Sequence, residues 1–192
     1  MSYKIAGVTG TLASGKDSLA VYLEDRYHFK HYSTADILRE ESMRLRGSIE
    51  RPVLYEVADQ LRHTQGGDVL VKMALERFEA QKGKYEGLVI SAMRSLAEVE
   101  AIKKAGGMIV WVDAPIELRY QRMVGRERDN ETRLNLEGFR ANEEKELHTG
   151  SDNPAAFNLT KIRDMADIHL ANDTDLDTFL AKAVKALDLG DT

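Results

Sequence analysis

Short apolar runs alternate with amphipathic stretches along most of the chain. The runs at 3–9, 29–33, 87–91, 108–112 and 167–171 are typical of strands, because they are short and rich in β-branched or aromatic residues. The stretches between them have apolar residues at helical spacing, with a break at 66–67; they cover 17–27, 35–46, 51–82, 96–105, 115–124 and 176–187. Strands that alternate with helices predict an α/β fold, a single domain over 1–192 with a parallel sheet covered on both faces.

Composition narrows the class of protein. Hydrophobic residues make up 43% and charged residues 31% of the 192 residues, which is typical of a soluble globular domain. No apolar run approaches the roughly 20 residues that cross a bilayer, so we expect a cytoplasmic protein without a membrane partner. The absence of cysteine excludes disulfides and thiolate metal sites. A net charge of −5 argues against nucleic acid as partner, and nothing in the pattern predicts an oligomeric state.

The first predicted strand runs into a glycine-rich segment, GTLASGKDS, and a helix follows. It matches G-x-x-x-x-G-K, with Gly10, Gly15 and Lys16 in register. Glycines let backbone N–H groups turn inward toward phosphate oxygens, the helix N-terminus adds positive potential, and the lysine reaches the outer phosphates. This arrangement predicts a site for the triphosphate of ATP. The residues expected to contact it are Gly10, Ala13, Ser14, Gly15, Lys16, Asp17 and Ser18.

Asp17 stands where this motif normally has a serine or threonine that ligates magnesium. A carboxylate is itself a hard oxygen ligand, so Asp17 is the candidate ligand for Mg2+, directly or through water. The alternative is that Asp17 only stabilises the start of the helix. Asp113, at the end of the fourth predicted strand, is a second candidate for the magnesium site or, equally, a helix cap.

The segment 31–41, HYSTADILREE, resembles the acceptor side of adenylate kinase and other nucleoside monophosphate kinases. That resemblance implies that Thr34 and Arg39 contact the acceptor, whereas an ordinary helix start is the alternative. Asp36 matches the last aspartate of a similar segment in dephospho-CoA kinase. After the third predicted strand, Arg94 stands where nucleotide kinases bind the acceptor phosphate, and Ser91 replaces their usual aspartate.

The segment 117–128, ELRYQRMVGRER, resembles the part of adenylate kinase that leads into its lid. By this resemblance Arg122 and Arg126 clamp the phosphates of ATP, and a lid covers about 125–148 with a return helix over 136–147. The two arginines share a helix face, where an anion between them would relieve their repulsion. The alternative is a solvated face. The end of the chain resembles dephospho-CoA kinase, which places Asn172 beside the adenine base.

The resemblance to the nucleotide kinase superfamily covers nearly the whole chain. It implies a three-layer P-loop NTPase fold with strand order 2-3-1-4-5, an acceptor-binding helical region at about 35–82, and a small lid. The implied activity is transfer of the γ-phosphoryl group of ATP to a small acceptor, first of all a nucleoside monophosphate. The alternatives are transfer to a hydroxyl, as in dephospho-CoA kinase, and a nucleotide-dependent switch that binds a partner. The implied catalytic residues are Lys16, Asp36, Arg94, Arg122 and Arg126; Thr34, Asp36, Arg39 and Arg94 bind the acceptor.

Overall fold

The computed structural model describes residues 4–125, 135–147 and 158–190. Its strands are β1 (Lys4–Gly10), β2 (Phe29–Ser33), β3 (Gly87–Ser91), β4 (Met108–Asp113) and β5 (Ile168–Ala171). Its helices are α1 (Lys16–Tyr27), α2 (Thr34–Arg46), α3 (Arg51–Gln65), α4 (Val69–Glu79), α5 (Leu96–Lys104), α6 (Ile116–Val124), α7 (Leu136–Leu147), α8 (Leu159–Asp164) and α9 (Leu176–Ala186), with a 3-10 turn at Lys82–Lys84.

The five strands form one parallel sheet in the order β2-β3-β1-β4-β5, which confirms the predicted fold and strand order. β1 lies at the centre, where Gly7 pairs with Ile90 of β3 and Ile109 of β4. All strands point the same way, so their carboxyl ends share one edge of the sheet. The loop after β1 and the residues after β3 therefore start from neighbouring positions.

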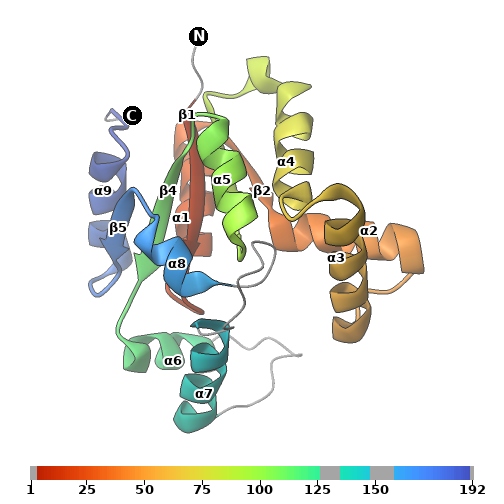
Figure 1. Ribbon diagram of the computed structural model, residues 1–192. Helices are drawn as coiled ribbons and strands as arrows, with labels where there is room; N and C mark the ends of the chain where they lie inside the picture. Colours follow the sequence, from red (N-terminus) through yellow and green to blue (C-terminus); the bar gives the residue numbers. More distant parts are fainter. Residues whose placement is uncertain (1–3, 126–134, 148–157, 191–192) are drawn as a thin grey trace.

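Helices cover both faces of the sheet (Figure 1). On one face α1 and α9 bury Leu19, Leu23 and Phe179 against β1 and β4. On the other face α5 and α8 bury Ile102 and Ile162. Burial of each such side chain contributes roughly 1.5–3 kcal/mol, and burial on both sides explains why the strands are continuous apolar runs without alternation.

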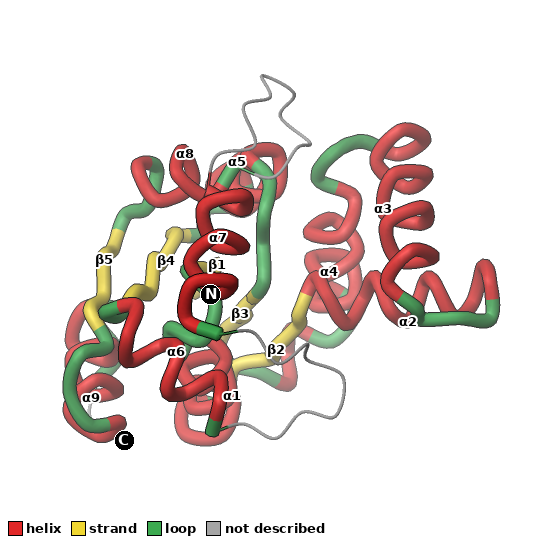
Figure 2. The backbone as a smooth tube through the Cα atoms, turned by 90° about the horizontal axis from the view of Figure 1, so that it is seen from below, coloured by secondary structure: helices red, strands yellow, loops and turns green. Residues whose placement is uncertain are grey.

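Three helices, α2, α3 and α4, extend beyond the β2 edge of the sheet (Figure 2). The side chain of Ser33 caps α2, and Gly47 ends it in a left-handed conformation with φ 67°. Val57, Leu61 and Ala74 bury the contact of these helices with one another. The helices lie in the region 35–82, where the sequence predicts acceptor binding.

One helix was not predicted. α8 has only six residues, and just two of them, Leu159 and Ile162, are buried, so the sequence offers too few turns for a helical period to appear. Its start is held locally, because the Asn158 side chain accepts a hydrogen bond from the Lys161 N–H. Among the helices that the structure describes, none has the length and apolar character that crossing a bilayer would require.

Candidate functional site

The loop between β1 and α1 is held in its curled shape by its two glycines. Gly10 has φ 152°, and a Cβ added to it would lie 1.9 Å from the carbonyl oxygen of Val112. Gly15 has φ 99°, and an added Cβ would lie 2.2 Å from Nδ2 of Asn172. Ala13 also adopts the left-handed region, with φ 60°, which costs an ordinary residue about 1–2 kcal/mol. Only glycine fits at 10 and 15, so the backbone conformation and the close contacts of the loop require both glycines of the motif.

The N-terminus of α1 has no side-chain cap. Gly15 occupies the capping position; α3, α4 and α6 also lack a side-chain cap, whereas serine, asparagine or aspartate side chains cap α2, α5, α8 and α9. The N–H groups of the first turn, including those of Lys16, Asp17 and Ser18, have no carbonyl partner within the helix, and such groups bind anions well. The Lys16 ammonium reaches back across the loop and donates to the Thr11 carbonyl at 3.3 Å. This set of donors fits a chain of phosphates.

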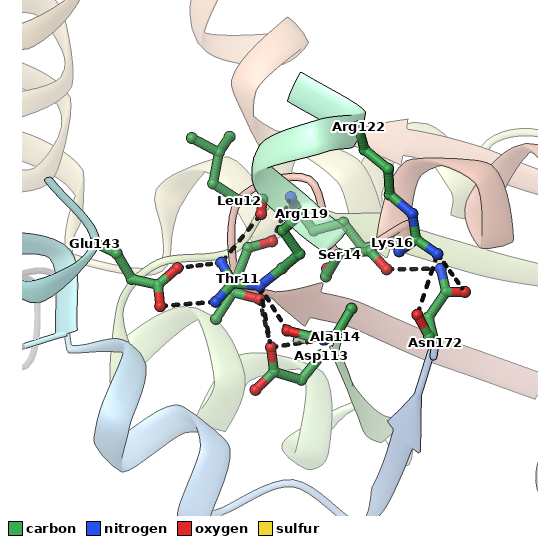
Figure 3. A network of polar contacts seen from close by, with 10 residues as sticks. All are labelled: Thr11, Leu12, Ser14, Lys16, Asp113, Ala114, Arg119, Arg122, Glu143 and Asn172. Carbon is green, nitrogen blue, oxygen red and sulfur yellow. Dashed lines mark hydrogen bonds and ion pairs between the residues drawn. The ribbon is translucent and has the colours of Figure 1, made fainter. Parts of the chain in front are cut away.

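Asn172 lies against the phosphate loop (Figure 3). It is buried, and its amide nitrogen donates to the Ser14 carbonyl at 2.8 Å. Arg122 in turn donates to the backbone and side-chain oxygens of Asn172 at 3.1 and 3.2 Å. The structure thus joins these two predicted residues with Ser14, and Asn172 positions the loop. Their predicted contacts with adenine and phosphate stay predictions.

Arg119 lies one turn before Arg122 in α6, and the sequence did not predict its burial or its partners. It is buried, and its guanidinium donates to the Ala114 carbonyl at 2.7 Å and the Leu12 carbonyl at 3.3 Å. The same guanidinium holds both carboxylate oxygens of Glu143 (Figure 3). A signal existed in the sequence, because Arg119 occupies a position of the face of α6 that is otherwise apolar.

The helix predicted over 136–147 is present as α7, and it packs on the phosphate loop. Phe139 is buried against Ala13 of that loop and Met123 of α6, and Glu143 is paired with Arg119. That this segment belongs to a lid stays a prediction. Arg126 lies outside the described residues, so its predicted contact with ATP has no structural account.

The magnesium prediction concerns Asp17, which is exposed in the first turn of α1 beside the loop. Within the described residues, no group of three or more histidine, cysteine, aspartate or glutamate side chains is placed to hold a metal ion. Magnesium that is bound mainly by phosphates and water needs only one or two protein oxygens, so Asp17 fits this chemistry. Asp113 has other partners: its Oδ1 accepts from Thr11 Oγ1 at 2.7 Å and the Ala114 N–H at 2.8 Å.

Ser91 replaces the usual aspartate at the end of β3 and is buried. Its Oγ lies 2.8 Å from Nε2 of His31 in β2. Burial lowers the pKa of His31 below its ordinary value, and the nearby carboxylates of Glu24, Asp17 and Asp36 oppose the shift. The neutral imidazole is therefore the form that this pair favours.

This pKa shift predicts how stability depends on pH. As pH falls, His31 takes up a proton at a higher pH in the unfolded chain than in the folded chain. The unfolded state is thereby stabilised, and the free energy of unfolding falls as pH drops from about 7 to about 5. We expect His31→Gln to make this fall shallower. Urea unfolding across this pH range measures it, with the exposed His63→Gln as control. An unchanged slope in the His31 variant would contradict the lowered pKa.

A cavity of ≈ 220 Å³ lies between α2, α3, α4 and the residues after β3. Two of the predicted acceptor residues, Thr34 and Arg94, line it. The Thr34 hydroxyl donates to the carbonyls of Ala92 at 3.0 Å and Ser91 at 3.3 Å. Asp36 and Arg39 form an exposed ion pair with each other and do not line this cavity. The structure therefore separates the four residues into two pairs.

Three charged residues also line the cavity: Arg51, Arg62 and Glu98. The sequence indicated only Arg62 among them, on a helical face with Glu56, Asp59 and Gln65 that would line the pocket or face water, and those other three do not line the cavity. Glu98 is buried, and its Oε2 accepts from the N–H groups of Arg94 at 2.8 Å and Ser95 at 3.1 Å. Burial raises the pKa of Glu98, and Arg62 and these hydrogen bonds oppose the shift. The signal in the sequence was the capping box, a serine followed three residues later by glutamate.

Comparison with known proteins places the chain among others of similar sequence. The family model described as an AAA domain matches residues 7–148. A UPF0200 protein of Sulfurisphaera tokodaii is 32% identical over 185 residues, which cover 96% of each chain. A UPF0200 protein of Thermococcus kodakarensis is 29% identical and covers 94% of this chain and 95% of its own length.

Solved structures share the fold at low identity. The protein TT1252 of Thermus thermophilus superposes with a TM-score of 0.65 at 20% identity, covering 100% of both chains. Shikimate kinase of Bacteroides thetaiotaomicron gives a TM-score of 0.62 at 13% identity, over 97% of this chain and 99% of its own. At such identities the likeness concerns the fold, which is that of P-loop kinases.

Proposed function

Because the chain belongs to the AAA domain family and to the UPF0200 proteins and has a P-loop kinase-like fold, we propose that it transfers the γ-phosphoryl group of MgATP to a small acceptor. One observation carries this proposal: the phosphate loop and the arginine-lined cavity lie at the same edge of the sheet. Thr9, just before the loop, donates to the Met93 carbonyl, just before Arg94, at 2.9 Å. A nucleotide switch would not need this second cavity.

The chemistry assigned to the protein is alignment and positive charge around the transferring group. The first-turn N–H groups of α1 and the Lys16 ammonium would hold the phosphates of ATP, and Asp17 would hold Mg2+. When bound, Mg2+ offsets the charge of the phosphate oxygens. Arg94 would orient an anionic group of the acceptor through its planar guanidinium. Arg122 is anchored on Asn172 and supports the loop from outside.

Two acceptor chemistries follow from the resemblance to nucleotide kinases. A nucleoside monophosphate, the first candidate, brings an ionised phosphate and needs no base. A hydroxyl, as in dephospho-CoA, needs a carboxylate to accept its proton, and Asp36 is the candidate. Asp36 is exposed at the start of α2, where Arg39 pairs with it.

The test is to incubate the protein with MgATP and a panel of nucleoside monophosphates and dephospho-CoA, and to measure ADP release with each. We expect release that depends on the acceptor, and a loss of about 10²–10³-fold in Lys16→Met, because a donor to the transferring phosphate is removed. Lys104→Met, which removes an exposed lysine at the end of α5, is the control and should keep full activity. ADP release that is independent of any acceptor would contradict transfer and favour a nucleotide-dependent switch.

A further inference from the structure

One face of α3 borders the cavity with a regular pattern. Arg51, Leu54, Tyr55, Ala58 and Arg62 all line it, at the spacing that places residues on one side of a helix. The face thus has an arginine at each end, with two aliphatic side chains and the Tyr55 phenol between them. The two arginines are eleven positions apart, so their Cα atoms lie about 16 Å apart along the axis. A ligand along this face would meet positive charge at two separated points.

Three arginines and one carboxylate are among the described residues that line the cavity. The Glu98 carboxylate accepts from the backbone N–H of Arg94 and interacts electrostatically with Arg62. Arg51 lies at the other end of α3, and within the part of the chain that the structure describes it makes no ion pair. Within the described wall, guanidinium groups outnumber carboxylates by three to one, and the planar guanidinium fork matches the oxygens of a carboxylate or phosphate.

The remaining wall is apolar. Leu38 of α2 and Leu70 of α4 face the same cavity as the middle of α3. Among the described residues that line it there is no asparagine, glutamine, histidine or serine, and the Thr34 hydroxyl already donates to two backbone carbonyls. Recognition of a nucleobase relies on hydrogen bonds to its edge, as in other proteins that read single bases. Apart from the Tyr55 hydroxyl, the described wall provides charge and apolar surface instead.

The size of the cavity also argues against a ligand that carries a nucleobase. Its ≈ 220 Å³ lie below the range of about 300–1,000 Å³ that is usual for pockets of drug-sized ligands. A compact molecule therefore fits it better than a large one that carries a base.

From these observations we propose that the acceptor is a compact molecule with two separated anionic groups, carboxylate or phosphate, joined by a largely apolar body. Arg62 and Arg94 hold one anionic group and Arg51 holds the other, while Leu54, Ala58 and Leu38 cover the body. This proposal rests on the proposed function, because it names the acceptor class for the same site. In this proposal the protein recognises the two charged ends of the acceptor, whereas a nucleotide acceptor would also be recognised by its base.

The test is a binding measurement that needs no turnover. Calorimetry with the full chain would compare linear dicarboxylates, from butanedioate to octanedioate, with monocarboxylates of equal length, and 3-phosphoglycerate would test a phosphate at one end. We expect the best dianion to bind about tenfold or more tightly than its matched monoanion, since a charge-assisted hydrogen bond contributes that much. Arg51→Gln should reduce this preference to about twofold or less, whereas Arg51→Lys should keep most of it.

Arg44→Gln is the matched control, because Arg44 is an exposed arginine of α2 that pairs with Glu41 and does not line the cavity. Circular dichroism checks that each variant is folded. The proposal is overturned if dianions have no advantage, if Arg51→Gln leaves that advantage intact, or if AMP binds about tenfold more tightly than ribose 5-phosphate, which would show that the base is recognised. The proposed function fails in a different assay, when neither the nucleotide panel nor the dianion that binds best stimulates ADP release.

Discussion

Replacement of Arg119 by methionine is expected to lower the free energy of unfolding by about 3–5 kcal/mol, because it leaves a carboxylate without its partner in a largely buried place. The side chain of Arg119 is 4% exposed and that of Glu143 is 15% exposed. The variant also removes the donor to the carbonyls of Ala114 and Leu12, so strain in the phosphate loop is expected along with the loss of α7 packing. Urea unfolding of the wild-type and variant proteins measures the difference.

The chain offers a matched control between the same two helices. Arg140 of α7 pairs with Glu117 of α6 at 2.6 Å, but the two side chains are 53% and 59% exposed. Because exposed pairs contribute only about 0–1 kcal/mol, Arg140→Met should have little effect on stability. Replacing Arg119 and Glu143 together by methionine should recover part of the loss, since no charge is then left buried. Equal losses in Arg119→Met and Arg140→Met would show that burial does not govern the Arg119 pair.

Replacement of Gly10 by alanine is expected to cost about 4 kcal/mol or more, or to prevent folding. The added Cβ would lie 1.9 Å from the Val112 carbonyl oxygen, which belongs to the backbone of β4 and cannot rotate away. The backbone at Gly10 also has a positive φ of 152°, which alanine rarely adopts. The pairing of β1 with β4 would therefore open where the phosphate loop begins. Thermal unfolding followed by circular dichroism measures the change.

Gly47 and Gly83 serve as controls that separate the effect of a positive φ on stability from the effect of the steric contact with Val112. Gly47 has φ 67° with open space around it, so Gly47→Ala should cost only about 1 kcal/mol of backbone strain. Gly83 has neither a positive φ nor an atom within 4 Å of an added Cβ, and Gly83→Ala should be close to neutral. A loss at Gly10 no larger than the loss at Gly47 would mean that the contact with Val112 relaxes easily.

The strands and most helices of this fold were predictable, because their signals are local. Apolar runs such as 87–91 and 108–112 are short and continuous, as buried parallel strands must be, and the pair Gly106-Gly107 marks the start of the second. α8 was missed because two buried residues do not define a period. The strand order was available only from the resemblance to nucleotide kinases, since no local pattern says which strands become neighbours.

The phosphate loop was also predictable from a local signal, because its two glycines and Lys16 all lie within 10–16 of the chain. The sequence placed Arg119 one turn before Arg122 but could not show its pairing with Glu143, which comes from another helix, 24 positions later. It left Arg62 open between the pocket and water and did not indicate Arg51, because both depend on the cavity that α2, α3 and α4 form together. Each of these roles requires two segments to meet.

Helical period, strand length and glycine spacing are properties of neighbouring residues, so the α/β class and the phosphate loop could be predicted from the chain alone. Which polar side chains are buried, and what they face, depends on how distant segments pack. That packing brings Asn172 to the Ser14 carbonyl and Glu143 to Arg119, and it lines the cavity with arginines from both ends of α3. The physical reason is that burial and charge pairing arise between segments far apart in the chain, and the energy of a charge depends on both.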